Sequence, residues 1–159
     1  MSYSFEITNP APHLATGVRF GDEGEAAGFA TGCGHWLLRE LKRAGAQGNP
    51  PDDPCTAYDE ATREPIGCSP TFLVMTREEC RRAAEGLRRL VAEGRSYSDA
   101  EHAALDDARF REDCRAHGVE YMPVTWAEPL SLDRTSLATW LAEFCERAAD
   151  HGEGLSVAR

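Results

Sequence analysis

A cysteine and a histidine lie close together in the segment Thr31-Gly32-Cys33-Gly34-His35, directly before a predicted helix. A thiol beside the exposed N–H groups at the start of a helix, where the helix dipole is positive, has a lowered pKa and forms the nucleophilic thiolate more readily. His35 would then act as the base that accepts the thiol proton. The same residues also fit a tight glycine turn in which Cys33 is packed and His35 faces water. Cys33 and His35 are therefore candidate catalytic residues, and the purely structural interpretation stays open beside them.

Four other residues are of types that bind zinc, and two of them are also spaced as zinc ligands are. Cys114 and His117 form a Cys-x-x-His pair. Either Cys55 with Cys68, or Cys33 with His35, would complete a set of four ligands. Structural zinc sites usually have two compact pairs, whereas this chain has one. Cys114 and His117 also lie one turn apart near a predicted helix end, where the dipole favours a histidine without any metal. We predict no bound metal or other cofactor, and the candidate ligands of the zinc alternative are Cys55, Cys68, Cys114 and His117.

Adjacent acidic residues and isolated histidines indicate no particular chemistry. The pairs Asp52-Asp53, Asp59-Glu60 and Asp106-Asp107 resemble acid–base pairs, but a chain with 27 acidic residues contains such neighbours by composition. Paired carboxylate catalysis requires side chains that face each other and have separated pKa values. We therefore assign these carboxylates to solvated surfaces. Three histidines in loops or near helix ends show no partner pattern: His13, His102 and His151.

Four helices with clear end signals must position these residues. Capping boxes, in which a Ser or Thr precedes a Glu by three residues, mark helix starts, and a glycine after the last turn marks a helix end. The first helix is predicted to start at Gly34 or His35 and to run to Ala44, with Gly45 as its stop. The second starts at the capping box Thr76–Glu79 and stops at Gly94, and the third starts at Ser98–Glu101 and runs to about His117, before Gly118. The fourth is capped by Ser131 or Asp133 and ends at Gly152.

The spacing of apolar residues predicts which faces of these helices are buried. The first helix is expected to bury its tryptophan and leucines and to direct its charged residues outward, Glu40 among them. The second and fourth helices carry apolar stripes that include Cys80 and Cys145, which should behave as small buried hydrophobes. The third helix is expected to be mostly solvated, with sparse apolar anchors such as Leu105 and Phe110.

Several short apolar runs predict a small sheet. Tyr3–Ile7 has the alternation of a half-buried strand, Leu14–Phe20 is a second strand that would pair with it, and Phe72–Met75 is a buried strand. Val119–Trp126 would be an edge strand, because a proline interrupts it. Residues 153–159 are either a short terminal strand or a frayed tail.

The segment Gln47–Pro70 holds five of the nine prolines and has no apolar periodicity, so we predict a long loop. Cys55 and Cys68 bracket much of this loop, and a disulfide between them would close it. In a reducing cytosol both thiols are expected to stay free.

Length and charge limit the classes of function. A chain of 159 residues suits one compact domain, and a net charge of −10 would repel a nucleic-acid backbone. The first residues lack the features of a signal peptide, and no apolar run is long enough to span a bilayer. Lys42 is the only lysine among 17 basic residues, an arginine bias that indicates a GC-rich bacterial genome. We expect a cytoplasmic protein that binds neither nucleic acid nor membrane.

Three short segments and their order carry a resemblance to other proteins. These segments are Trp36-Leu37-Leu38 on the first helix, Thr76-Arg77-Glu78-Glu79 with Ala83-Ala84 on a capped helix, and Trp140-Leu141-Ala142-Glu143-Phe144-Cys145 on the last helix. With the Pro-rich loop and strand between them, they resemble a group of uncharacterised small bacterial proteins of actinobacterial type. The resemblance implies a small α+β fold and no known activity, so it assigns no site residue.

We therefore expect a single α+β domain in which a small, mostly antiparallel sheet packs with about four helices. The favoured function is a non-catalytic, cytoplasmic protein-binding or regulatory module whose partner offers a basic or apolar surface. Such a module should carry an exposed apolar or acidic patch. Two alternatives stay open: a thiol-dependent enzyme or redox sensor that uses Cys33, and a small structural zinc-binding protein. The sequence favours a protein that is not an enzyme, and it leaves the oligomeric state open.

Overall fold

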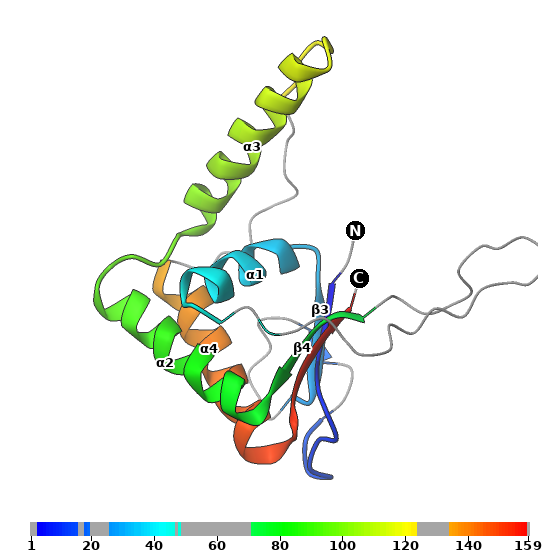
Figure 1. The fold of residues 1–159 in the computed structure, drawn as a ribbon, viewed down its shortest axis with the longest axis vertical. Coiled ribbons are helices and arrows are strands. Elements are labelled where there is room, and N and C mark those ends of the chain that lie inside the picture. Colours follow the sequence, from blue (N-terminus) through cyan, green and yellow to red (C-terminus); the bar gives the residue numbers. More distant parts are fainter. Residues whose placement is uncertain are drawn as a thin grey trace, which may run out of the picture.

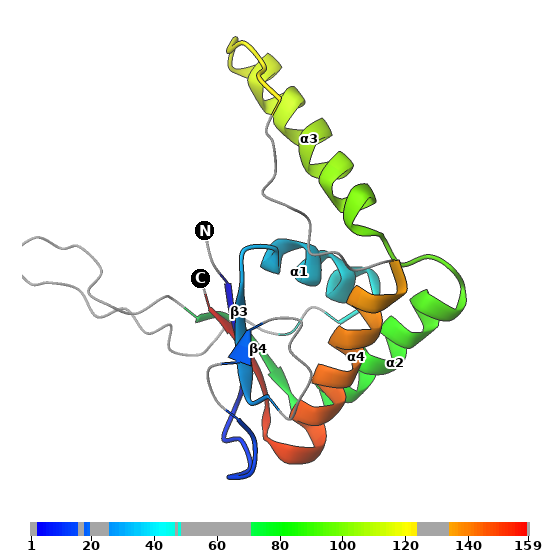
Figure 2. The same cartoon turned by 180° about the vertical axis from the view of Figure 1, so that it is seen from behind.

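A five-stranded sheet with helices α1, α2 and α4 on one side forms the body of the protein, and helix α3 stands away from it (Figures 1 and 2). The computed structural model describes residues 3–15, 18–19, 26–46, 48, 71–123 and 134–158. The elements are β1 (Tyr3–Ile7), β2 (Val18–Arg19), β3 (Gly28–Thr31), α1 (Gly34–Arg43), β4 (Thr71–Thr76), α2 (Arg77–Ala92), α3 (Asp99–Ala116), α4 (Arg134–His151) and β5 (Gly154–Ala158). This is the predicted single small α+β domain.

The strand order is β2-β3-β1-β5-β4, and every neighbouring pair except β2 with β3 is antiparallel. The predicted pairing of the segment Leu14–Phe20 with the first strand is wrong. Its described part, β2, instead pairs in parallel with β3, where Val18 lies opposite Phe29. Strand β3 escaped prediction because four residues are too few for a clear alternation.

The last strand, β5, is central in the sheet, so the frayed-tail alternative for residues 153–159 is wrong for the part that the structure describes. β5 pairs with β1 on one side and with β4 on the other. Leu155 and Val157 point into the core and are fully buried, whereas Ser156 between them faces the other side of the sheet. These five residues therefore join the edge strand β4 to the other three strands of the sheet.

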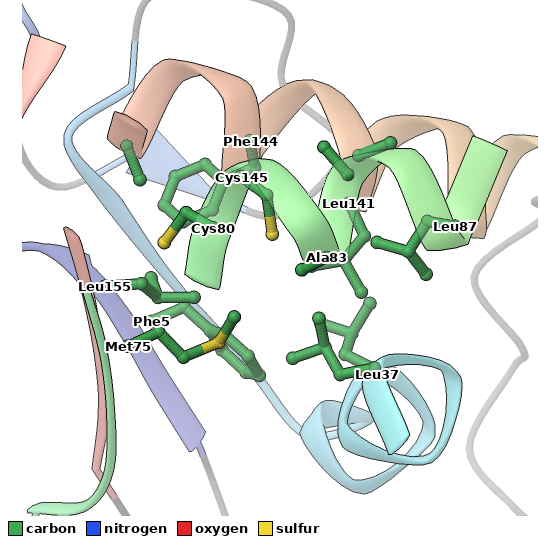
Figure 3. Close-up of a cluster of buried hydrophobic side chains, with 14 of the residues drawn as sticks. Phe5, Leu37, Met75, Cys80, Ala83, Leu87, Leu141, Phe144, Cys145 and Leu155 are labelled. Atoms are coloured by element: carbon green, nitrogen blue, oxygen red, sulfur yellow. The ribbon is translucent and has the colours of Figure 1, made fainter. Parts of the chain in front are cut away.

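The core lies between the inner face of the sheet and the three helices that cover it, as Figure 3 shows for Phe5, Leu155 and Leu141. The two predicted buried thiols are confirmed: Cys80 and Cys145 have no exposed surface. Burial, with a smaller effect of Glu79, raises the pKa of Cys80 to about 12. These two thiols are therefore packing groups.

Local signals set the helix ends as predicted. The Thr76–Glu79 and Ser98–Glu101 capping boxes are both present, with each side chain bonded to the backbone of the other residue. Gly45, Gly94 and Gly118 adopt positive φ values of 82°, 64° and 64° directly after α1, α2 and α3. Ser131 and Asp133, the predicted caps of α4, and most of the Gln47–Pro70 loop lie outside the described residues.

The side chains that helix α3 buries are not the ones that the sequence predicted. The predicted anchors Leu105 and Phe110 are 41% and 39% exposed, while His102 and Cys114 are buried. The described part of the predicted edge strand, residues 119–123, has no strand structure and follows the turn at Gly118. Across the described ranges, no helix is long and apolar enough to cross a membrane.

Candidate functional site

Charged and aromatic side chains gather where α1 meets the start of α3. We call this group the α1–α3 polar cluster. Successive turns of α1 bring its own members to one side, because residues three, four and seven apart share a helix face. The members are His35, Trp36, Arg39, Glu40 and Arg43 of α1, with Tyr97, Asp99, His102 and Asp106 from α3 and the residues just before it.

Asp106 receives three donors from α1 and is largely buried. Its Oδ2 accepts from His35 Nε2 at 2.6 Å and from Trp36 Nε1 at 2.7 Å, and its Oδ1 accepts from Arg39 Nη2. Burial alone would raise the pKa of this carboxyl, but the hydrogen bonds from Arg39, Trp36 and His35 outweigh it and lower the pKa. The prediction of a solvated Asp106 is therefore wrong.

His102 lies between two aromatic rings and is 0% exposed. Trp36 stacks on it, with ring centroids 5.3 Å apart and 9° between the planes, and Tyr97 meets it edge-on at 5.4 Å. Arg39 Nη1 lies 2.8 Å from Nδ1 of His102. Because a guanidinium has only donors, Nδ1 accepts and the ring proton is on Nε2.

Glu40 was expected to point outward, yet it is 0% exposed. Its Oε1 accepts from Arg43 Nη1 at 3.0 Å and from the backbone N–H of Tyr97 at 3.2 Å, and it lies 3.2 Å from Nε2 of His102. Its Oε2 has no hydrogen-bond partner among the described residues. Arg43 also covers the Tyr97 ring, with its guanidinium carbon 3.6 Å from the ring centroid. A buried carboxylate thus links α1 to the segment that leads into α3.

The lowered pKa of Asp106 predicts a specific loss of stability in acid. A carboxyl whose pKa is lower in the folded than in the unfolded protein stabilises the fold above its unfolded pKa, and this stabilisation is lost as pH falls through the folded value. At pH 7 we expect Asp106→Asn to unfold with a free energy about 2 kcal/mol below that of the wild type, since hydrogen bonds to a charged group are lost.

As pH falls through the lowered folded pKa, the wild-type carboxyl is itself protonated, and the two proteins should converge. Urea unfolding of both proteins at several pH values measures this difference. A difference that stays constant from neutral to acid pH would contradict the role given to the Asp106 charge.

The catalytic candidates from the sequence lie at the edge of this cluster. Cys33 is the residue before α1, is partly exposed, and is not activated: burial, with the carboxylates of Asp99 and Asp106, raises its pKa. The predicted lowering by the helix dipole is therefore wrong, because desolvation and nearby negative charge outweigh it. His35 is oriented by Asp106, as a general base is in nucleophilic sites.

The metal candidates are not brought together where the structure describes them. Cys114 is buried, whereas His117 is exposed and its Nδ1 lies 2.8 Å from the backbone oxygen of Asp113. Cys55 and Cys68 lie outside the described residues. Within the described ranges, no group of three or more His, Cys, Asp or Glu residues could hold a metal ion.

A second feature is the exposed apolar surface of α3 and the residues after it. Leu105, Phe110, Val119 and Met122 are the large apolar side chains that are exposed in the described part of the chain, at 41%, 39%, 60% and 73%. We call residues 105–122 the α3 arm.

The end of the α3 arm is ordered by its own contacts. Tyr121 donates to Asp107, packs near Phe110 at 5.9 Å between ring centroids, and lies under the guanidinium of Arg111 at 4.7 Å. The residues after Gly118 thus fold back along the helix and leave apolar side chains beside it in contact with water.

Comparisons of the chain with protein-family models, with curated proteins and with solved structures gave no match. Sequence reasoning missed three members of the α1–α3 polar cluster: Glu40 was expected on the outward face of its helix, Asp106 was assigned to a solvated surface, and His102 showed no partner pattern. The only signal that could have pointed to Glu40 is its position three residues before Arg43 and four after Trp36, on the side of the helix that carries the tryptophan.

Proposed function

We propose that this chain is a non-catalytic, cytoplasmic protein-binding module whose contact surface is the α3 arm. The observation that carries the proposal is the gathering of exposed large apolar side chains on this one arm. Isolated exposed apolar residues are common, but their concentration on one projecting element is typical of an interaction site.

The shape and charge of the molecule support the same function. The α3 arm stands away from the body in both views (Figures 1 and 2), so a partner can reach it from several sides. The arm carries five acidic residues and three arginines within a chain of net charge −10. The matching partner is therefore a protein with an apolar patch beside basic residues, since opposite charge steers association.

A thiol-dependent activity is less well supported. The contact between His35 and Asp106 favours it, but the raised pKa of Cys33 keeps the thiol protonated near neutral pH, and a nucleophile requires the thiolate. A zinc-binding function has no support from Cys114 and His117, for the reasons given above.

Site-specific photo-crosslinking tests the proposal directly. A photoreactive phenylalanine analogue is placed at Phe110 or at Met122, and a matched control at the exposed Arg89 on α2, and the protein is irradiated in the cells that produce it. We expect the same adduct from both arm positions and none from position 89. Mass spectrometry of the adduct identifies the partner.

The affinity of that purified partner then measures the role of the side chains. The double variant Phe110→Ser and Met122→Ser should bind about tenfold or more weakly than the wild type, because buried apolar anchors contribute most of an interface's energy. Arg89→Ser should bind as the wild type does. Equal adducts from all three positions, adducts only between two copies of this chain, or an unchanged affinity of the double variant would each overturn the proposal.

A further inference from the structure

We propose that Tyr121 is a positioning residue of the α3 arm: it fixes the segment after α3 so that its exposed apolar side chains are already arranged for a partner. The proposal rests on the binding function proposed above for the same arm. Tyr121 acts together with Asp107 and Arg111, and we call these three side chains the Tyr121 clamp.

The clamp is a closed set of contacts. The Tyr121 hydroxyl donates to Oδ1 of Asp107, and Nε of Arg111 donates to Oδ2 of the same carboxylate at 2.9 Å. The Cζ of Arg111 lies over the Tyr121 ring, 4.7 Å from its centroid. Because each member touches the other two, displacement of any one of them loses two contacts at once.

The chemistry of the three groups suits a lasting contact. The hydrogen bond to Asp107 raises the pKa of Tyr121, so the hydroxyl keeps its proton and continues to donate near neutral pH. A hydrogen bond to a charged carboxylate is stronger than one between neutral groups. The face of the tyrosine ring also attracts the guanidinium above it.

The end of α3 brings Tyr121 to this place. Gly118, with a φ of 64°, reverses the chain directly after the helix, and the N–H of Val119 bonds to the carbonyl of Cys114 at 2.9 Å. Figure 1 shows the chain turning back at the far end of α3. Asp107 and Arg111 are one helical turn apart and share a face, so both are in reach of the returning Tyr121.

The side chains beside the clamp are exposed, and this indicates its role. Fixing a chain segment costs conformational entropy, and burial of apolar surface is the usual compensation. Val119 and Met122 are 60% and 73% exposed, so they gain little of it. A partner that covers them binds a segment whose ordering cost has already been met by the clamp. The clamp therefore benefits binding more than it benefits the free protein.

Nitrogen relaxation NMR of the full chain measures the ordering. In the wild type, the amides of Glu120, Tyr121 and Met122 should have order parameters near about 0.8, as rigid backbone has. Tyr121→Phe and Asp107→Ala should both lower them toward about 0.6, because each variant removes the hydrogen bond between the two side chains. The control Glu85→Ala, at an exposed position on α2, should leave them unchanged.

The double variant shows whether the two residues act through each other. Tyr121→Phe should add no further mobility when it is made in Asp107→Ala, since the acceptor of the hydroxyl is already absent. The ring of Tyr121→Phe can still pack under Arg111, so Tyr121→Ser should be the more mobile of the two single variants at this position.

The affinity for the protein captured by crosslinking at Phe110 and Met122 tests the consequence for binding. A binding-competent conformation that is populated only part of the time lowers the apparent affinity by that fraction. The loss of affinity in Asp107→Ala should therefore match the fall in the ordered population, which amide chemical shifts report. We expect about three- to tenfold, the range for loss of one net hydrogen bond.

Urea unfolding separates positioning from a purely structural role. Asp107→Ala and Tyr121→Phe should unfold at the same urea concentration as Glu85→Ala, because the clamp lies on the arm that stands away from the body (Figures 1 and 2). A residue that only stabilises the fold would lower the midpoint and leave the affinity of the folded protein unchanged.

Three results would overturn the proposal. They are unchanged order parameters in both single variants, a loss of order without a loss of affinity, and a further loss of affinity when Tyr121→Phe is added to Asp107→Ala. The last result would mean that the hydroxyl contacts the partner directly. A lack of adducts at Phe110 and Met122 would instead overturn the binding function, and the relaxation measurement would still decide whether the clamp orders the arm.

Discussion

A chain that ends at Glu153 is expected to lose its cooperative unfolding transition. The deletion removes β5, which pairs with both β1 and β4, and takes away the fully buried side chains of Leu155 and Val157. Burial of two such side chains contributes about 3 to 6 kcal/mol by itself, and a typical domain is stable by only about 5 to 15 kcal/mol. The two flanking strands also lose their hydrogen-bond partner, so little of the stability should remain.

Thermal unfolding followed by circular dichroism measures this outcome. Two point variants on the same strand separate the loss of packing from the loss of chain length. Val157→Asp places a charge in the core and should unfold the protein, whereas Ser156→Thr on the opposite face should change its stability by less than about 0.5 kcal/mol. A truncated protein that melts cooperatively near the temperature of the full chain would show that β5 does not hold the sheet together.

Replacement of Glu40 by alanine is expected to lower the free energy of unfolding by about 3 kcal/mol, a large effect for a helix position that appears polar from its sequence. The side chain is fully buried, and its Oε1 faces the N–H of Tyr97, the guanidinium of Arg43 and Nε2 of His102. Without it, the N–H of Tyr97 and the guanidinium of Arg43 lose their acceptor inside the protein. A buried group left unpaired is more costly than the original pair is stabilising.

Urea unfolding of a small series tests this role of Glu40. Glu40→Gln keeps an acceptor oxygen and loses the charge, so its loss of stability should be smaller, about 1 to 2 kcal/mol. Glu85→Ala, at an exposed position on α2, is the matched control and should lie within about 0.5 kcal/mol of the wild type. If Glu40→Ala behaves like Glu85→Ala, the buried contacts of Glu40 contribute nothing to the fold.

The polar character of the α1–α3 contact matters for how α3 is held. An apolar contact between two helices is non-directional and tolerates sliding, whereas the hydrogen bonds of Asp106 and His102 to Arg39 require one orientation. The α3 arm is therefore presented at a defined angle by a small number of charged residues. The same charges make its attachment sensitive to substitution and to pH.

Much of the local structure follows from the sequence by itself. The starts of α2 and α3 and the ends of α1, α2 and α3 agree with the predictions, because a capping box or a terminal glycine acts over a few neighbouring residues. The buried thiols Cys80 and Cys145 agree for a similar reason: the apolar periodicity of a helix shows which side faces the core.

Only the tertiary structure decided the candidate site and the centre of the sheet. Arg39 meets His102 and Asp106 across 63 and 67 positions of sequence, and β5 pairs with β1 across almost the whole chain. Whether a charged side chain is solvated or buried depends on what packs against it, and local spacing carries no information about a partner so distant in sequence. Glu40 and Asp106 therefore have the sequence signature of surface residues, and the fold turns them into the buried charges that attach α3.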